Sequence, residues 1–308
     1  MAHRAARSRQ RAWVVTGLRG IRDACASPTV PRRWAACLLA AAMGVATMLT
    51  AGCRADRTRA ELARFGVNPR HLRGARLVGA RLVRADLRHA DLRGADLSQA
   101  ALDGADLRGA DLSDATLRGA SLNVANVGTH AKPRWAYTDL RDAKLLRADM
   151  RSCALVGTLL AGADLSGADL TGSRFYRANQ PGGEYVVTAT PMNRARLRGA
   201  TLAGLDLGAV SFFGADLTGA DLSGAILQHA NLNGAVLRRA SLRGADMAGS
   251  RLLSGADLSG ADLTKADLRG ADLRTANMTG TDTTGCRSDG LTRWPKGTGP
   301  RGRESGRG

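Results

Sequence analysis

One feature of the sequence constrains the fold more than any other: a unit of five residues, most often ADLRG, recurs from about residue 70 to residue 280. With the Leu of each unit taken as its centre, 37 centres can be assigned, in blocks that begin at Leu72, Leu140, Leu197 and Leu258. A period of five matches neither the 3.6-residue period of a helix nor the two-residue alternation of a flat strand. The chain must therefore bend once in every unit.

This regular bend predicts a coil with four walls. If the central Leu and the residue two before it, usually Ala, both point inward, each unit supplies one wall and one corner, and four units close a coil of about twenty residues. Coils stacked at the β-spacing of roughly 4.8 Å would give about nine coils and a rod of roughly 45 Å. Small Ala is expected where the four walls converge. With only 4% aromatic residues, the chain cannot fill the broad layered core of an ordinary α/β enzyme.

The repeated unit resembles A(D/N)LXX, the repeat of the pentapeptide-repeat family, over about residues 70–280. The resemblance implies an all-β solenoid, a right-handed quadrilateral β-helix, in which each coil buries its faces only against its neighbours. Such repeats specify a shape far more clearly than a ligand. The sequence therefore names neither a partner nor an oligomeric state.

Both ends of the solenoid need covering. At the N-terminal end, residues 54–69 are expected to form a short cap, with a helix over 58–65 whose Leu62 and Phe65 cover the first coil. At the other end, residues 281–308 are rich in Gly and charge and are predicted to form a disordered tail.

Residues 1–53 read as a basic and apolar leader. Residues 1–33 carry eight Arg and one Asp, and residues 34–53 are then without charge. Twenty such residues can span a bilayer as a leader helix or serve as the apolar part of an export signal. The positive-inside rule would place the chain after residue 53 outside the cytoplasm.

The apolar run ends in Leu49-Thr50-Ala51-Gly52-Cys53, which resembles the lipobox of bacterial lipoproteins and makes Cys53 a candidate for lipidation. One alternative is an uncleaved anchor formed by residues 34–53. Another is a segment without a membrane role, buried or upstream of the true translation start. The first two readings predict the extracytoplasmic face of a bacterial cell membrane, and the third leaves the protein in the cytoplasm.

Outward positions of the repeat often carry Asp before the central Leu and Arg after it. Stacked acids such as Asp86 over Asp106 could hold cations, but interleaved Arg already supplies counter-charge. His89 and His229 stand where the unit usually has Gly. No Ser/His/Asp or Cys/His constellation, phosphate loop or metal-ligand spacing is evident, so we expect no catalytic residues, no metal, no cofactor and no enzymatic activity.

Two interruptions of the repeat, near residues 128–138 and 181–194, predict loops that leave the rod at or beside one corner, two coils or roughly 10 Å apart. With Val127 and Phe175 as centres, that corner adjoins wall four, and Leu140 resumes on wall one. Five of the few aromatic residues gather here, beside basic residues, as is common at recognition sites. The partner-binding candidates are Arg134, Trp135, Tyr137, Tyr176 and Tyr185; alternatively, these rings, with Phe175, pack the loops onto the rod.

The resulting functional hypothesis is a non-catalytic scaffold for an unknown protein partner, tethered to the membrane through residues 34–53 or a lipidated Cys53. An alternative comes from pentapeptide-repeat proteins that modulate DNA gyrase or topoisomerase by mimicking duplex DNA. Such mimicry needs an acidic surface, whereas residues 54–280 hold 31 basic against 23 acidic residues, and a leader would separate the chain from gyrase. Direct nucleic-acid binding is disfavoured because no stacking aromatics accompany a basic groove.

Overall fold

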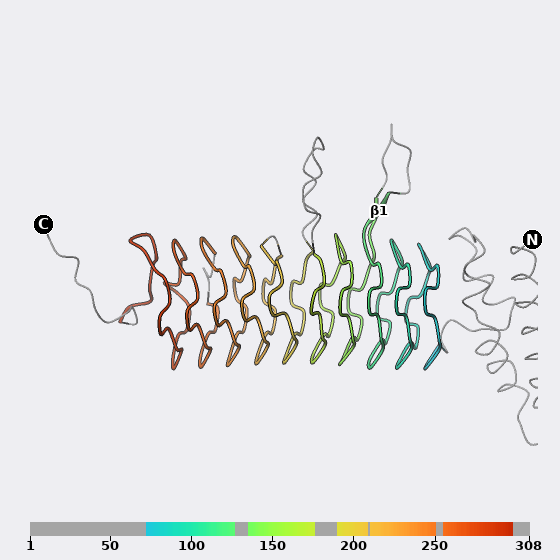
Figure 1. Ribbon diagram of the computed structural model, residues 1–308, viewed down its shortest axis with the longest axis horizontal. Coiled ribbons are helices and arrows are strands. Elements are labelled where there is room, and N and C mark those ends of the chain that lie inside the picture. The colour runs from blue at the N-terminus through green and yellow to red at the C-terminus, as the bar shows by residue number, and fades with distance from the viewer. Residues whose placement is uncertain (1–71, 127–134, 176–189, 209, 251–254, 298–308) are drawn as a thin grey trace, which may run out of the picture.

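The computed structural model describes residues 72–126, 135–175, 190–208, 210–250 and 255–297. These residues form a rod of stacked square coils (Figure 1). Residues twenty positions apart, such as Asp86 and Asp106, pair through parallel bridges from one coil to the next. The two extended strands, β1 (Ala125–Asn126) and β2 (Trp135–Ala136), pair antiparallel on one side of the rod. The expected four-walled β-solenoid is present.

Each corner is a tight turn that the sequence encodes at the residue two after the central Leu. At the first described corner, Ala75 N donates to Leu72 O at 3.0 Å, and Gly74 between them has φ 64°. Gly adopts this left-handed conformation without the clash that a Cβ introduces. Where the unit lacks Gly, the geometry persists: His89 and His229 have φ 55° and 60°. Stacking of the coils therefore imposes a conformation that costs these residues roughly 1–2 kcal/mol each.

The core is a column of inward-facing Leu and Ala. Representative residues Leu107 and Ala105 are each 0% exposed, as predicted for the centre and the residue two before it. Phe175 and Phe212 replace Leu at two centres and are 1% and 0% exposed. Phe175 is predicted as a centre of the repeat, and its burial confirms that position. Its predicted place on wall four is wrong, because the bridge from Ala154 to Arg174 puts it on the same wall as Leu122 and Leu155.

We number the walls from the first coil by their centres, Leu72, Leu77, Leu82 and Leu87, as walls one to four. The bridge from Asp106 to Asp139 places the unit of Leu140 on wall four, the wall that the spacing of the repeat predicts for Val127. Leu140 therefore resumes on wall four and not on wall one. Val127 lies outside the described residues.

Both interruptions leave the rod between wall three and wall four. The first separates Leu122 from Leu140, and the second separates Phe175 from Met192. Since these two coils are two steps apart in the stack, about 10 Å separates the exits. We call the corner between walls three and four the exit corner, because both insertions interrupt the repeat there.

The solenoid continues past the predicted end at residue 280. Asp282, Arg287 and Arg293 bridge to the coil beneath them, and Trp294 packs against the core. The boundary of the expected disordered tail is thus corrected for residues 281–297, because turn-forming Gly285 (φ 67°) and the backbone ladder sustain another coil.

The leader (1–53), the cap (54–69) and residues 298–308 lie outside the described residues. Among the residues that the structure describes, no helix has the length and apolarity needed to cross a membrane.

Candidate protein-binding surface

Three buried threonines mark wall four at the exit corner. Thr138, Thr158 and Thr190 hold the inward position in three successive coils, where most other units have Ala, and each is 0% exposed. A buried hydroxyl needs a hydrogen-bond partner, and the carbonyls of wall three supply it. The interior of the rod at the exit corner therefore contains three buried hydroxyl groups.

Two of these threonines, Thr158 and Thr190, donate to carbonyls whose turn hydrogen bonds the insertions remove, while Thr138 Oγ1 donates to Leu102 O and Asn123 O. In a regular unit the carbonyl of the central Leu accepts from the backbone N–H three residues later, as Leu102 O does from Ala105 N at 2.9 Å. The chain leaves the coil after Leu122, and Thr158 Oγ1 of the next coil donates to Leu122 O at 2.6 Å instead. Thr190 Oγ1 lies 3.2 Å from Phe175 O and 2.7 Å from Leu155 O. Thr158 thus bonds the start of the first insertion to the coil above it, whereas Thr190 bonds the end of the second insertion to Leu155 of the coil below it.

The β1–β2 pair is anchored to the coil below it. An added Cβ at Gly104 would lie 3.0 Å from Ala136 Cβ, so Gly allows β2 to approach the rod closely. Gly104 N donates to Thr138 Oγ1 at 2.8 Å. On wall three, Asn123 N donates to Asp103 Oδ1 at 2.9 Å, and Asn123 Oδ1 accepts from Val156 N at 3.1 Å. The base of the first insertion is held rigidly on both sides.

Two of the predicted binding residues project from this base. Trp135 and Tyr137 are 49% and 41% exposed, and as residues two apart on an extended segment they point to the same side. Ala136 between them faces Gly104. The structure brings Trp135 and Tyr137 together at the surface. Arg134, Tyr176, Tyr185 and the lipidation candidate Cys53 lie outside the described residues.

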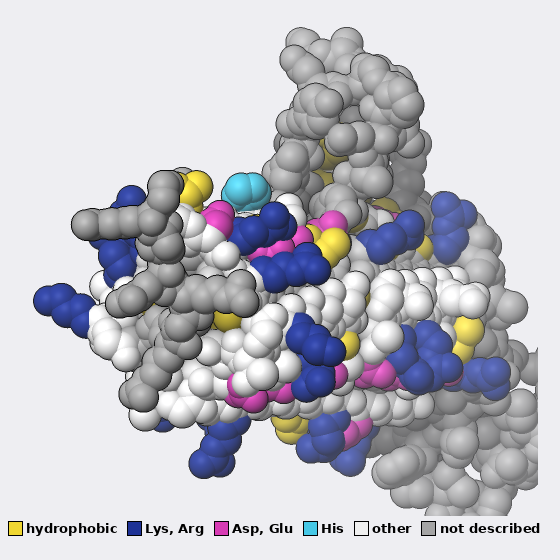
Figure 2. Space-filling model, turned by 60° about the vertical axis from the view of Figure 1, so that its left-hand side comes forward, with side chains coloured by type: hydrophobic (Ala, Val, Ile, Leu, Met, Phe, Trp, Pro, Cys, Tyr) yellow, Lys and Arg dark blue, Asp and Glu magenta, His cyan; other side chains and the backbone are white. Residues whose placement is uncertain are grey.

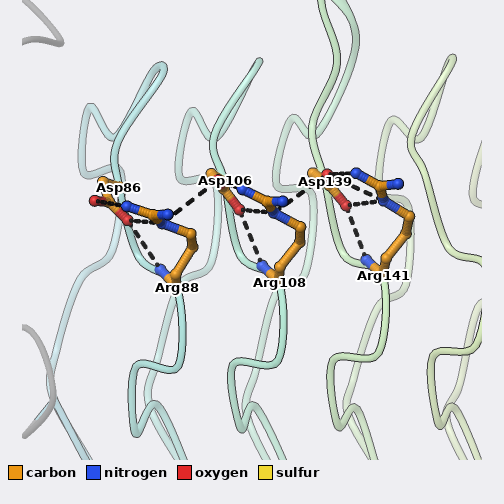
Figure 3. Close-up of polar contacts among 6 residues, drawn as sticks. All are labelled: Asp86, Arg88, Asp106, Arg108, Asp139 and Arg141. Carbon is orange, nitrogen blue, oxygen red and sulfur yellow. Dashed lines mark hydrogen bonds and ion pairs between the residues drawn. The ribbon is translucent and has the colours of Figure 1, made fainter.

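The charged side chains of the walls form local pairs. Figure 2 shows basic and acidic side chains next to one another over the face in view. On wall four, Arg108 Nε and Nη2 donate to Asp106 at 2.9 and 2.7 Å, and Arg108 Nε lies 3.6 Å from Asp139 of the next coil. The same arrangement joins Asp86 to Arg88 and Asp139 to Arg141 (Figure 3). Guanidinium groups thus occupy the space that stacked carboxylates would offer to a cation.

These contacts also set the ionisation of the acids. The hydrogen bond from Arg93 lowers the pKa of Asp91 to about 2. Burial opposes ionisation of Asp257, but hydrogen bonds from Ser259 and Arg238 outweigh it and lower the pKa of Asp257 to about 2. No cluster of three or more His, Cys, Asp or Glu suited to a metal ion occurs in the described part of the chain.

A groove on wall one was not anticipated from the sequence. It has a volume of about 610 Å³ and is lined by Arg198, Asp216, Thr218, Val236, Arg238, Arg239 and Ser259. The sequence signal was available: Arg198 and Arg238 follow a centre whose preceding residue is Arg196 or Val236 instead of Asp. Neither Arg therefore has an acid in its own turn.

Comparison with known proteins agrees with the repeat. The family model described as pentapeptide repeats matches in 8 copies, over residues 71–102, 90–126, 148–179, 192–228, 220–252 and 253–287. No protein of curated function matches the chain.

Similar solved structures include HetL, a pentapeptide-repeat protein involved in heterocyst differentiation regulation from the cyanobacterium Nostoc sp. strain PCC 7120. It is 32% identical, with 74% of this chain and 92% of that chain covered and a TM-score of 0.40. QnrB1, a plasmid-mediated fluoroquinolone resistance protein, is 19% identical over 70% of this chain and 91% of that chain, with a TM-score of 0.36. A pentapeptide-repeat protein of the Arabidopsis thaliana thylakoid lumen is 27% identical over 39% and 65%, with a TM-score of 0.21.

Proposed function

Because this chain belongs to the pentapeptide-repeat family, whose members form right-handed β-helices, we propose that it is a non-catalytic scaffold that binds a protein partner at its exit corner. The observation that carries the proposal is the pair of exposed rings, Trp135 and Tyr137, on a base held by backbone and side-chain hydrogen bonds. Large aromatic side chains presented on a rigid support lose little entropy on binding and are common centres of interface energy.

The arrangement of the exit corner supports this proposal in a second way. Exposure of two large rings costs solvation free energy that packing onto the rod would recover, and Ala136, not either ring, contacts Gly104. The alternative prediction, that the rings serve to pack the loops onto the rod, thus receives less support from Trp135 and Tyr137.

The test uses the full-length chain with Trp135→Ala and Tyr137→Ala, and Phe213→Ala as the matched control. Phe213 is similarly exposed, at 46%, but lies on a different coil of wall four. Partners captured by the wild type with a cross-linker should fall at least tenfold with the first two variants and remain within twofold with the control. If both variants fold and retain capture, the exit corner is not the binding surface.

We further propose that residues 34–53, or a lipidated Cys53, hold the scaffold at the extracytoplasmic face of the membrane. The supporting observation is the uncharged run of residues 34–53 behind an Arg-rich segment. The mature N-terminus measured by mass spectrometry distinguishes the two anchors, since lipidation requires cleavage before Cys53. Recovery of intact protein beginning at residue 1 in the soluble cytoplasmic fraction would reject both.

Mimicry of duplex DNA has weaker support than binding through the exit corner. A DNA mimic must present unpaired negative charge along one face, whereas Asp86, Asp106 and Asp139 on wall four are each paired with an Arg. Protection or inhibition of gyrase by the purified chain would nevertheless favour this alternative.

A further inference from the structure

The arginines of the wall-one groove differ from those of the Asp-Leu-Arg units in how their N–H donors are used. Arg198 Nη1 lies 3.1 Å from Asp216 Oδ2, and Arg238 Nε contacts Asp257 Oδ2, so each guanidinium contributes one donor to one carboxylate of a neighbouring coil. No ion pair or side-chain hydrogen bond is found for Arg239 among the described residues. A guanidinium has five N–H donors. Most donors in this groove thus remain available.

The paired arginines of the Asp-Leu-Arg units provide the comparison. Arg93, also on wall one and at the same position of its unit as Arg198 and Arg238, donates through both Nε and Nη2 to Asp91, at 2.8 and 2.7 Å. The fork of Arg93 is therefore already satisfied by an acid in its own turn. Arg198 and Arg238 have no acid in their own turn to accept two donors in this way, because residues 196 and 236 are Arg and Val.

The shape of the groove follows from small residues between the arginines. Thr218 lies on the coil between those of Arg198 and Arg238 and leaves a hollow where a third long side chain could stand. Two coil steps separate Arg198 from Arg238, or about 10 Å, which is the length of about three residues of extended peptide. The three exposed guanidinium groups therefore border a trough sized for a short extended segment.

The two acids that contact Arg198 and Arg238 also accept other hydrogen bonds. Asp216 Oδ1 accepts from Thr218 N and Oγ1, at 3.0 and 2.6 Å, while Asp257 Oδ1 accepts from Ser259 N at 3.0 Å and from Asn277 Nδ2 at 3.1 Å. Both carboxylates thus have partners within the rod besides the two arginines. The charged groups that remain able to contact a ligand are therefore the guanidinium groups of the three arginines.

From this geometry we propose that the wall-one groove is a second binding site, which takes an acidic, extended peptide segment of a partner protein. Carboxylates of the segment accept the unused N–H donors of Arg198, Arg238 and Arg239, in the forked geometry that guanidinium favours. A nucleic acid fits less well: no aromatic residue lines the groove for stacking bases, and three arginines supply few contacts for a phosphate backbone. The site is on wall one, away from the exit corner between walls three and four.

The experiment measures fluorescence anisotropy of a labelled nine-residue peptide, (Glu-Ser-Gly)₃, with the full-length chain at low and physiological salt. Its Gln counterpart and a labelled oligothymidylate are the comparison probes. We expect the Glu peptide to bind at least tenfold more tightly than the Gln peptide, and binding to fall at least tenfold in the triple variant Arg198→Gln, Arg238→Gln, Arg239→Gln. The control Arg93→Gln removes one positive charge from the same wall, as each single substitution in the groove does, and should change affinity less than twofold.

A second variant separates the groove from net charge. Thr218→Arg raises the positive charge, but it fills the hollow and completes an Asp-Leu-Arg unit with Asp216. The variant should therefore bind the Glu peptide at least fivefold more weakly than the wild type does. Equal binding by the triple variant and by Arg93→Gln, or stronger binding by Thr218→Arg, overturns the proposal. Tighter binding of oligothymidylate than of the Glu peptide overturns the peptide assignment. Loss at this groove leaves capture at the exit corner unchanged, so the two proposals fail separately.

Discussion

Replacement of Thr158 by Val tests whether buried threonines compensate for the interrupted turns. The substitution keeps the branched shape and replaces the hydroxyl that donates to Leu122 O at 2.6 Å. Thr158 is 0% exposed, and no other donor to Leu122 O occurs among the described residues. A buried carbonyl that loses its partner costs about 1–3 kcal/mol. Burial of the new methyl group offsets at most about 0.8 kcal/mol of that cost.

We therefore expect Thr158→Val to lower the free energy of unfolding by about 0.2–2.2 kcal/mol, the difference of these two contributions. The assay is guanidinium unfolding followed by circular dichroism, with native-state hydrogen exchange at Val124 and Ala154 to detect local opening. Thr116→Val is the control, because it makes the same chemical change at an outward, half-buried position. Its free energy of unfolding should stay within about 0.5 kcal/mol of the wild-type value.

The reasoning would be refuted if Thr158→Val were as stable as Thr116→Val with unchanged exchange. Thr158→Ser gives an independent check, since it retains the hydroxyl but loses a methyl group. It should preserve slow exchange at the exit corner even though it loses roughly 1 kcal/mol of apolar burial.

Two further predictions concern ionisable groups. The pKa values of Asp91 and Asp257 are lowered to about 2 in the folded chain. The two ionised carboxylates therefore stabilise the fold fully above the unfolded pKa near 3.9, and this stabilisation is lost as the pH falls toward 2. The thermal midpoint should fall between pH 4 and pH 2, and less steeply in Asp257→Asn; equal slopes for the two proteins would contradict this. Burial raises the pKa of the Cys153 thiol to about 12, so iodoacetamide at pH 8 followed by peptide mapping should label half-buried Cys286 well before Cys153, and comparable rates in the folded protein would show that Cys153 is accessible.

Much of the rod could be predicted from the repeat because its period directly determines which residues face inward. Leu107 and Ala105 occupy the interior as expected, and a Gly two residues after each centre predicts the corners. The loop exits were harder to assign. Leu140 lies on wall four and not on the predicted wall one, because the backbone ladder with the coil below, and not the count of units, sets the register.

The candidate sites divide in the same way. Trp135 and Tyr137 could be selected from sequence because rings are scarce in this chain, and both are exposed. Phe175 was separable from them by its register, because it stands at a centre of the repeat, and it is buried. The wall-one groove involves residues 18 and 19 positions apart, and it becomes visible only when the coils are stacked.

The sequence by itself determined the period, the inward Leu and Ala, the corner glycines and hence a four-walled solenoid, because these depend on a local unit repeated many times. The tertiary structure decided which unit lies above which. That register sets the position of the exit corner, the hydrogen bonds that Thr138, Thr158 and Thr190 donate to backbone carbonyls, and the acid with which each Arg pairs. An Arg with Asp in its own turn is satisfied locally, as Arg93 is. An Arg without one, such as Arg238, depends on the neighbouring coil, and only the stacked structure reveals how many of its donors remain free.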